Sequence, residues 1–222
     1  MARFKRMEVY KMVEAQRMMP VFYHSDPEIA KRVMKACYNG GGRLFEFTNR
    51  GDFAHEVFAE VYKWAAKEIP EMIIGVGSVI DAGTANFYMQ MGANFIVSPT
   101  LKEEMAFSCN RRKVAWMPGC GSMTEISRAE ELGAEVVKIF PGAAVGGPSF
   151  VKAILGPSPW SNIMPTGGVE PTKENLTAWF QAGVFCVGMG SKLLTKDIIN
   201  NKDFDLLENK VKKVTGYQHN LL

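Results

Sequence analysis

The stretch VVKIFPG, residues 136–142, carries the clearest structural signal in the chain. Its apolar run is too short for a helix and is closed by Pro141-Gly142, so we expect a buried strand. Lys138 lies inside this run. Burial of an ammonium group is costly unless it is paired, and it favours the neutral amine. A neutral lysine in a dry pocket can attack a carbonyl group, whereas a lysine at a strand end can instead extend its amine into water.

The same unit, a short apolar strand followed by a helix, recurs on both sides of this stretch. Strands are expected at residues 18–23, 44–48, 72–76, 95–98, 114–117, 136–140, 162–164 and 185–187. Helices are expected at residues 26–37, 52–67, 81–91, from about 102, from 122, and at 149–155, 172–182 and 204–214. Alternation of this kind indicates a parallel sheet covered by helices on both faces.

Eight such units in a chain of 222 residues predict an α/β fold, most simply a (β/α)8 TIM barrel. We expect one domain over residues 18–222, with residues 1–17 as an N-terminal helical extension that caps the barrel or packs on a neighbouring subunit. An open doubly wound sheet is the alternative. It is disfavoured because no GxGxxG turn follows the first strand.

The composition favours a soluble cytoplasmic protein. The net charge is only +3 and no basic block is present, so neither nucleic acid nor a membrane surface is an expected partner. No stretch approaches the roughly 18 apolar residues of a membrane span, and the first residues lack the apolar core of a signal peptide. The four cysteines form no CxxC pair, which suits reduced thiols. The three histidines form no cluster with carboxylates, so we expect no metal site.

Two strands place chemically useful side chains on shared faces. Side chains alternate along a strand, so Glu46 shares a face with Thr48, and Lys138 shares one with Phe140. If both faces point into a barrel, Glu46 and Lys138 meet in its interior, near the strand ends where this fold carries its active sites. The glutamate could move protons beside a neutral lysine, or it could form an ion pair that only satisfies a buried charge.

Glycines end the seventh and eighth expected strands, at Gly167-Gly168 and in the stretch GMGS at residues 188–191. In a (β/α)8 barrel these two strand ends often bind phosphate through backbone N–H groups, which glycine allows the anion to approach closely. Each segment alone could be a simple turn. Together they predict a site for phosphate or a similar anion.

Seven strand-end motifs give the chain a family resemblance over residues 18–196. It resembles the 2-keto-3-deoxy-6-phosphogluconate (KDPG) aldolase / 4-hydroxy-2-oxoglutarate (KHG) aldolase family. The motifs, in order, are LFEFTNR (44–50), GVGSV (75–79), FIVSP (95–99), MPGCGSMTE (117–125), VKIFPGAAVGG (137–147), PTGGV (165–169) and VGMGSKL (187–193). Any one motif is weak, but seven in register make a specific signal.

The resemblance implies a class I aldolase of carbohydrate metabolism that needs no cofactor, serves the Entner–Doudoroff pathway and is usually a homotrimer. It implies that Lys138 forms a Schiff base and that Glu46 is the general acid and base. It also implies that Arg50 and Ser78 bind the substrate carboxylate. The phosphate-binding residues would be Gly167, Gly168, Gly190 and Ser191, and further pocket-lining residues would be Thr48, Pro99, Phe140 and Thr166.

The implied reaction cleaves KDPG to pyruvate and glyceraldehyde 3-phosphate. The chain departs from the family pattern where Ser78 replaces a threonine, Thr100 a glycine and Gly142 an alanine, and where Cys120-Gly121-Ser122 follows Pro-Gly. None of these changes removes a catalytic group, but they leave the substrate open. The alternatives are an aldolase for KHG or for 2-keto-3-deoxy-6-phosphogalactonate, and a non-catalytic sugar-phosphate-binding barrel.

Overall fold

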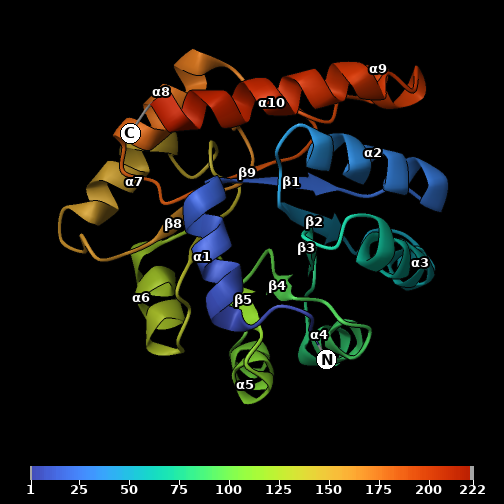
Figure 1. Ribbon diagram of the computed structural model, residues 1–222. Helices are drawn as coiled ribbons and strands as arrows, with labels where there is room; N and C mark the ends of the chain where they lie inside the picture. Colours follow the sequence, from blue (N-terminus) through green and yellow to red (C-terminus); the bar gives the residue numbers. More distant parts are fainter. Residues whose placement is uncertain (1, 221–222) are drawn as a thin grey trace.

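The computed structural model describes residues 2–220 and shows short parallel strands that alternate with helices (Figure 1). The strands are β1 (Met18–Phe22), β2 (Leu44–Thr48), β3 (Ile73–Gly77), β4 (Phe95–Val97), β5 (Ala115–Met117), β6 (Gly119–Cys120), β7 (Val137–Ile139), β8 (Ile163–Pro165) and β9 (Val187–Met189). The helices are α1 (Arg6–Gln16), α2 (Pro27–Asn39), α3 (Ala54–Glu68), α4 (Ala82–Gln90), α5 (Glu103–Arg112), α6 (Met123–Glu131), α7 (Gly147–Leu155), α8 (Lys173–Gln181), α9 (Lys196–Asn200) and α10 (Phe204–Asn220).

The strands form two parallel sheets, with orders β5-β4-β3-β2-β1-β9 and β6-β7-β8. Pro118 separates β5 from β6, since it has no N–H to donate, but its carbonyl accepts a hydrogen bond from the Lys138 N–H at 2.9 Å. On the other side, Thr166 after β8 pairs with Gly188 of β9 in an isolated parallel bridge. The protein therefore has an α/β fold with a curled parallel sheet, and the complete eight-stranded barrel stays a prediction.

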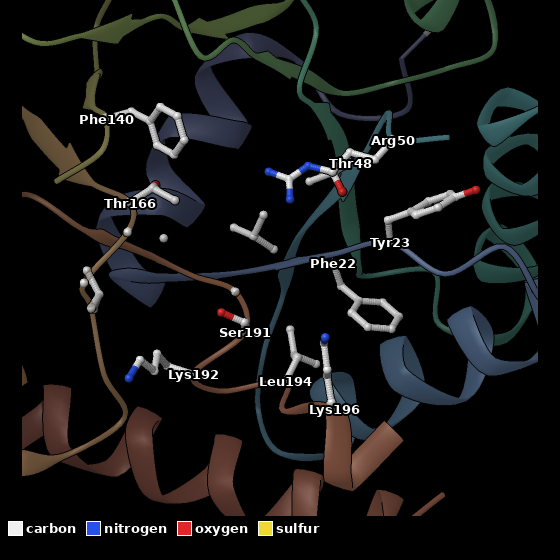
Figure 2. Close-up of a pocket in the computed structure, with 16 residues that line it drawn as sticks. Phe22, Tyr23, Thr48, Arg50, Phe140, Thr166, Ser191, Lys192, Leu194 and Lys196 are labelled. Carbon is white, nitrogen blue, oxygen red and sulfur yellow. The ribbon is translucent and has the colours of Figure 1, made fainter. Parts of the chain in front are cut away.

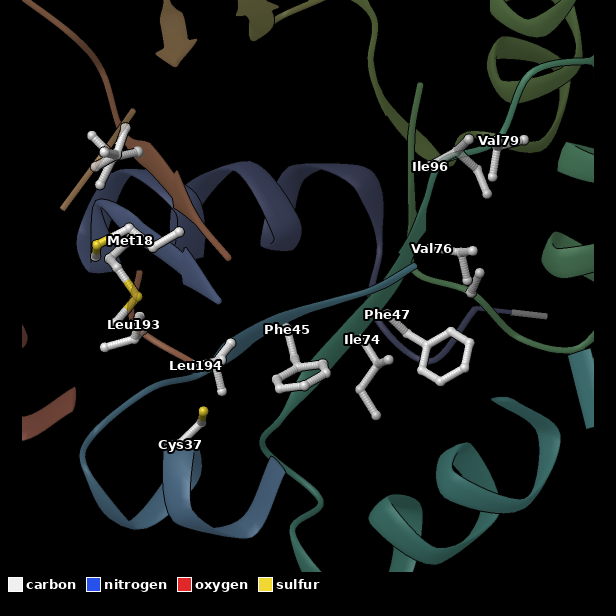
Figure 3. Packing of buried hydrophobic residues seen from close by; sticks show 14 of the residues in the cluster. Met18, Cys37, Phe45, Phe47, Ile74, Val76, Val79, Ile96, Leu193 and Leu194 are labelled. Atoms are coloured by element: carbon white, nitrogen blue, oxygen red, sulfur yellow. The ribbon is translucent and has the colours of Figure 1, made fainter. Parts of the chain in front are cut away.

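Alternation along the strands divides the core into two layers. Phe45 and Phe47 of β2 and Ile74 of β3 belong to a large cluster between the strands and the outer helices (Figure 3). The residues next to them, Leu44 and Ile73, belong to a second cluster on the opposite face. This inner cluster draws side chains from both sheets and contains Val9, Val13, Met19, Leu44, Ile73, Phe95, Val97, Ala115, Met117, Val136, Met164 and Cys186.

Helix α1 covers the amino-terminal end of the inner cluster. Val9 and Val13, its two buried residues, pack into that cluster. Arg6 donates from Nε and Nη2 to the Val114 carbonyl, at 3.1 and 2.7 Å, and the hydroxyl of Tyr10 bonds the backbone of Trp116. The N-terminal helix expected from the sequence is therefore a cap on the strands, which leaves their carboxyl ends open.

The structure departs from the expected elements in four places. The sequence predicts a strand end at Pro118-Gly119, but the chain continues as β6, where Gly119 packs against the Pro99 backbone too closely for a Cβ. Strand β9 begins at Val187, because Phe185 instead donates its N–H to Ile163 beside β8. The short helix α9 is not predicted, and α10 continues to Asn220 rather than ending near residue 214. Among residues 2–220, no helix combines the length and the apolar character that crossing a membrane would require.

Candidate active site

Lys138 lies at the centre of β7 with a side chain that is only 6% exposed. Its amine Nζ is 4.0 Å from Oε1 of Glu46 and 4.9 Å from the ring centroid of Phe140. The cation predicted inside an apolar strand is therefore buried and faces one carboxylate. It does not reach into water as a lysine at a strand end would.

Glu46 occupies the centre of β2 and is almost completely buried. Its carboxylate fits because Gly77 of the neighbouring strand, two positions beyond the register partner Gly75, lacks a Cβ, which would collide with Oε1. The other oxygen, Oε2, has no hydrogen-bond partner among the described residues. An unpartnered buried oxygen is costly, and in a site it is available to a ligand or a proton.

Burial controls the protonation of this pair. It raises the pKa of Glu46, and the nearby charges of Lys138 and Arg50 only oppose that shift. Burial also lowers the pKa of Lys138; Glu46 opposes this shift, and Arg50 adds to it. Both shifts favour the uncharged forms, a neutral amine and a protonated carboxyl, which are the forms needed for attack on a ketone and for donation of a proton.

Arg50 and Ser78 connect the loops after β2 and β3. The Arg50 Nε donates to the Ser78 Oγ at 3.1 Å. Ser78 has φ = 58°, a left-handed conformation that is uncommon outside glycine and is often found at functional sites. The Arg50 loop is held from behind, because the Tyr88 hydroxyl donates to Oδ1 of Asn49 at 2.7 Å. The exposed guanidinium is thus positioned to receive an anion.

A pocket of about 450 Å³ opens above these residues, at the carboxyl ends of the strands (Figure 2). Eight predicted site residues line it: Thr48, Arg50, Phe140, Thr166, Gly167, Gly168, Gly190 and Ser191. Gly188 of the GMGS stretch also lines it, together with seven residues that the sequence does not single out as site residues: Val21, Phe22, Tyr23, Val169, Lys192, Leu194 and Lys196. Val21, Phe22 and Tyr23 lie at the carboxyl end of β1, where this fold places its site residues, so the sequence could have indicated them. Lys196 belongs to helix α9, which the sequence did not predict.

Four predicted site residues do not line this pocket. Glu46 and Lys138 each precede a lining residue by two positions on the same strand face, so they lie one layer deeper. Ser78 reaches the pocket only through its bond to Arg50. Pro99 is not among the residues that line this pocket; its backbone lies close to Gly119, where β4 approaches β6, and its role in the site stays a prediction.

The loop after β8 has the geometry of an anion site. Gly167 and Gly168 have φ values of 90° and 81°, which disfavour any other residue. Carbonyls of this loop are bonded to the loop after β7: Gly142 N–H donates to Thr166 and Ala143 N–H to Gly167, at 2.8 and 3.0 Å. Within the part of the chain that the structure describes, the N–H groups of Gly167 and Gly168 have no acceptor. They remain available to a bound anion.

The chain matches the family model described as KDPG and KHG aldolase over residues 9–210. The chain belongs to the KDPG and KHG aldolase family. This aldolase is 34% identical over 197 residues to the 2-dehydro-3-deoxy-phosphogluconate aldolase of Pseudoalteromonas atlantica, with 89% of each chain covered. It is 31% identical over 186 residues to the KHG/KDPG aldolase of Escherichia coli, with 84% of each chain covered.

Solved structures give the same assignment. The aldolase superimposes with a TM-score of 0.82 and 28% identity on KDPG aldolase from Legionella pneumophila, a crystal structure with pyruvate captured as a covalent carbinolamine intermediate, covering 91% of this chain and 96% of that one. KDPG aldolase of Zymomonas mobilis with 3-phosphoglycerate gives a TM-score of 0.81 and 25% identity, covering 95% and 96%. The protein is thus an aldolase, a lyase that acts on small molecules.

Among its described residues, no three His, Cys, Asp or Glu side chains are grouped so that they could hold a metal ion.

Proposed function

We propose that this protein is a class I aldolase that cleaves KDPG to pyruvate and glyceraldehyde 3-phosphate through a Schiff base on Lys138. The observation that carries the proposal is the buried Lys138–Glu46 pair, with Nζ and Oε1 4.0 Å apart, directly beneath a pocket edged by glycine loops. The carbinolamine in the Legionella enzyme supports covalent chemistry in the family, although it belongs to that protein.

Each chemical step has a group suited to it. The neutral Lys138 amine attacks the C2 ketone, and Glu46 donates its proton as the carbinolamine loses water, which gives an iminium ion. Glu46, now ionised, takes the proton of the C4 hydroxyl, directly or through a water molecule. The C3–C4 bond then breaks, its electrons pass to the iminium as an enamine, and the aldehyde leaves. Protonation of the enamine at C3 and hydrolysis release pyruvate and restore Lys138.

Two anion sites would hold the ends of the substrate. Arg50 with Ser78 suits the C1 carboxylate, because a guanidinium forms paired, charge-assisted hydrogen bonds with a carboxylate. The free N–H groups of Gly167 and Gly168, with Gly190 and Ser191 beside them in the same pocket, suit the C6 phosphate. Thr48, Phe140 and Thr166 line the space between them.

We also propose that the two sheets close into a (β/α)8 barrel formed by residues 18–222 as one domain, with residues 1–17 as its helical extension. Residues 1, 221 and 222 of these ranges lie outside the described residues. The inner cluster supports closure, since it contains side chains from both sheets. The hydrogen bond from Lys138 to Pro118 and the Thr166–Gly188 bridge link the sheets on either side.

The homotrimer also stays a proposal. Several large apolar side chains on neighbouring loops and helices are exposed to solvent. A monomeric protein rarely exposes so many of them together, which supports an interface between subunits. The exposed side chains are Phe53 (67% exposed), Ile80 (60%), Phe87 (49%) and Phe107 (51%). Light scattering would give the subunit number. The cytoplasmic location expected from the sequence stays a prediction.

Borohydride trapping tests the mechanism. Reduction in the presence of pyruvate should add a stable three-carbon adduct on Lys138, identified by peptide mass spectrometry. An adduct on another lysine would overturn the assignment, and a protein that binds sugar phosphates without turning them over would be the non-catalytic barrel. Measuring kcat/KM for KDPG, its galactonate isomer and KHG would then fix the substrate. KHG is a real alternative because the Escherichia coli relative is named for both.

A further inference from the structure

Two lysines line the pocket on the segment that follows the β9 glycine loop, and only one of them is paired. The Lys192 amine lies 2.9 Å from Oε1 of Glu170. Glu170 comes shortly after the Gly167-Gly168 turn, so this ion pair connects the two glycine loops. Both partners are partly exposed, and such a pair contributes little stability. Its effect here is to neutralise Lys192 and to tie the loops together.

Lys196 has no acidic partner among the described residues. Figure 2 shows its side chain rising from the start of α9 beside Leu194 and Phe22, with the amine toward the pocket. A turn in the segment between Gly190 and Lys196 brings this side chain to the pocket. The N–H groups of Leu193 and Leu194 both donate to the Gly190 carbonyl at 3.0 Å, and the Thr195 hydroxyl caps α9 by accepting from Ile198.

The base of Lys196 is fixed although its amine is in solvent. Leu193 and Leu194 before it and Ile198 and Ile199 after it are all buried. The side chain therefore starts from a rigid position on the same rim as Ser191. A mobile cation at a fixed site next to free backbone N–H groups is a suitable partner for a phosphate dianion, as a point charge with three rotatable donors.

We propose that Lys196 binds the phosphate of the substrate and makes the enzyme select phosphorylated over unphosphorylated 2-keto acids. The inference rests on the proposed function, in which the glycine loops hold that phosphate. The loops supply oriented dipoles but no net charge, and Arg50 is committed to the carboxylate. Lys196 supplies the full positive charge that separates a dianion from a neutral or singly charged end group.

The test compares Lys196→Met with Lys196→Arg and with Lys212→Met, an exposed lysine on α10 that lines no part of this pocket. The readout is the ratio of kcat/KM for KDPG to kcat/KM for KHG. Lys196→Met should lower this ratio at least about tenfold, because a hydrogen bond to a charged group contributes roughly 1.5–3 kcal/mol. Lys196→Arg should retain most of the preference, and Lys212→Met should leave it unchanged.

Inorganic phosphate provides a second readout that does not depend on catalysis. Its dissociation constant, measured by calorimetry, should rise in Lys196→Met by the same factor as the ratio falls. An unchanged ratio together with unchanged phosphate affinity would mean that Lys196 is only a solvated lysine. Failure of pyruvate trapping in the unmodified protein would instead overturn the proposed function, and phosphate affinity would still decide the role of Lys196.

Discussion

Lys138 and Glu46 face each other at 4.0 Å, although β7 and β2, which carry them, belong to different sheets. No hydrogen-bonded ladder connects those two strands. The pair exists because the sheet curls, so that the inner faces of both parts point toward one interior. The reactive geometry is therefore a consequence of the curvature of the sheet, and changes that loosen its closure should affect chemistry before they affect overall folding.

Replacing Lys138 by methionine should separate catalysis from stability. We expect kcat to fall by at least about a thousandfold and pyruvate trapping to disappear, because the covalent intermediate cannot form. Because burial favours the uncharged forms of both groups, replacing Lys138 alone leaves no unpaired charge on Glu46, so the variant should be about as stable as the parent. Urea unfolding measures this difference. A large loss of stability would show that the Lys138–Glu46 pair is structural.

Glu46→Gln keeps the shape of the side chain and removes its ability to exchange a proton. The expected loss in kcat is about 100- to 10,000-fold, typical for a general acid and base. The neutral amine of Lys138 would remain, so trapping with pyruvate should be slowed but still modify Lys138. Rapid-quench measurement of trapping checks this. Trapping at the parent rate would exclude Glu46 from carbinolamine dehydration.

The pH dependence of trapping should report the lowered pKa of Lys138. The amine reacts when neutral, so the rate should fall as pH drops through that pKa, at a pH below the 10.5 of an ordinary lysine. The Glu46 charge opposes the lowering, and its removal in Glu46→Gln should move the acid limb to lower pH. The Arg50 charge adds to the lowering, so Arg50→Gln should move it to higher pH. Shifts in the reversed directions would contradict this arrangement.

Arg50→Gln should also weaken binding of the 2-keto acid. Loss of a charge-assisted contact with the carboxylate should raise KM about 10- to 100-fold, while the Lys138–Glu46 pair stays in place. Ser78→Ala removes the hydroxyl that receives the Arg50 Nε–H, and a smaller rise in KM is expected. Steady-state kinetics with pyruvate and glyceraldehyde 3-phosphate checks both variants. Equal effects on phosphorylated and unphosphorylated substrates are expected, in contrast to the Lys196 variants.

Gly77→Ala tests the packing around Glu46. The added methyl group would collide with the Glu46 carboxylate, and such overpacking typically costs about 1–3 kcal/mol and displaces the side chain. We expect lower stability together with a fall in kcat. Gly156→Ala is the matched control, because its Cβ would meet nothing closer than 3.6 Å and its backbone suits alanine. A fully active Gly77→Ala enzyme would show that the position of Glu46 is not critical.

The sequence by itself determined the order and type of most elements, since short apolar runs closed by proline or glycine leave little choice of structure. β2 at residues 44–48 is as predicted, because alternation along a strand is a local property, whereas Glu46 and Lys138 share an environment only because the sheet curls. The family also followed from the sequence, through residues that stand at strand ends. The expectation that a proline ends its strand failed at Pro118. Its missing N–H interrupts the strand, but its carbonyl still accepts a hydrogen bond from Lys138 of β7.

Only the tertiary structure decided which residues share the pocket. Lys192 pairs with Glu170, whereas Lys196 has no acidic partner among residues 2–220, a difference that no pattern in GMGSKLLTK contains. The backbone of Pro99 lies close to Gly119, where β4 approaches β6, and Lys138 lies one layer below the pocket surface rather than on it. The physical reason is that burial and charge pairing arise between segments far apart in the chain, and burial is what lowers the pKa of the Lys138 amine.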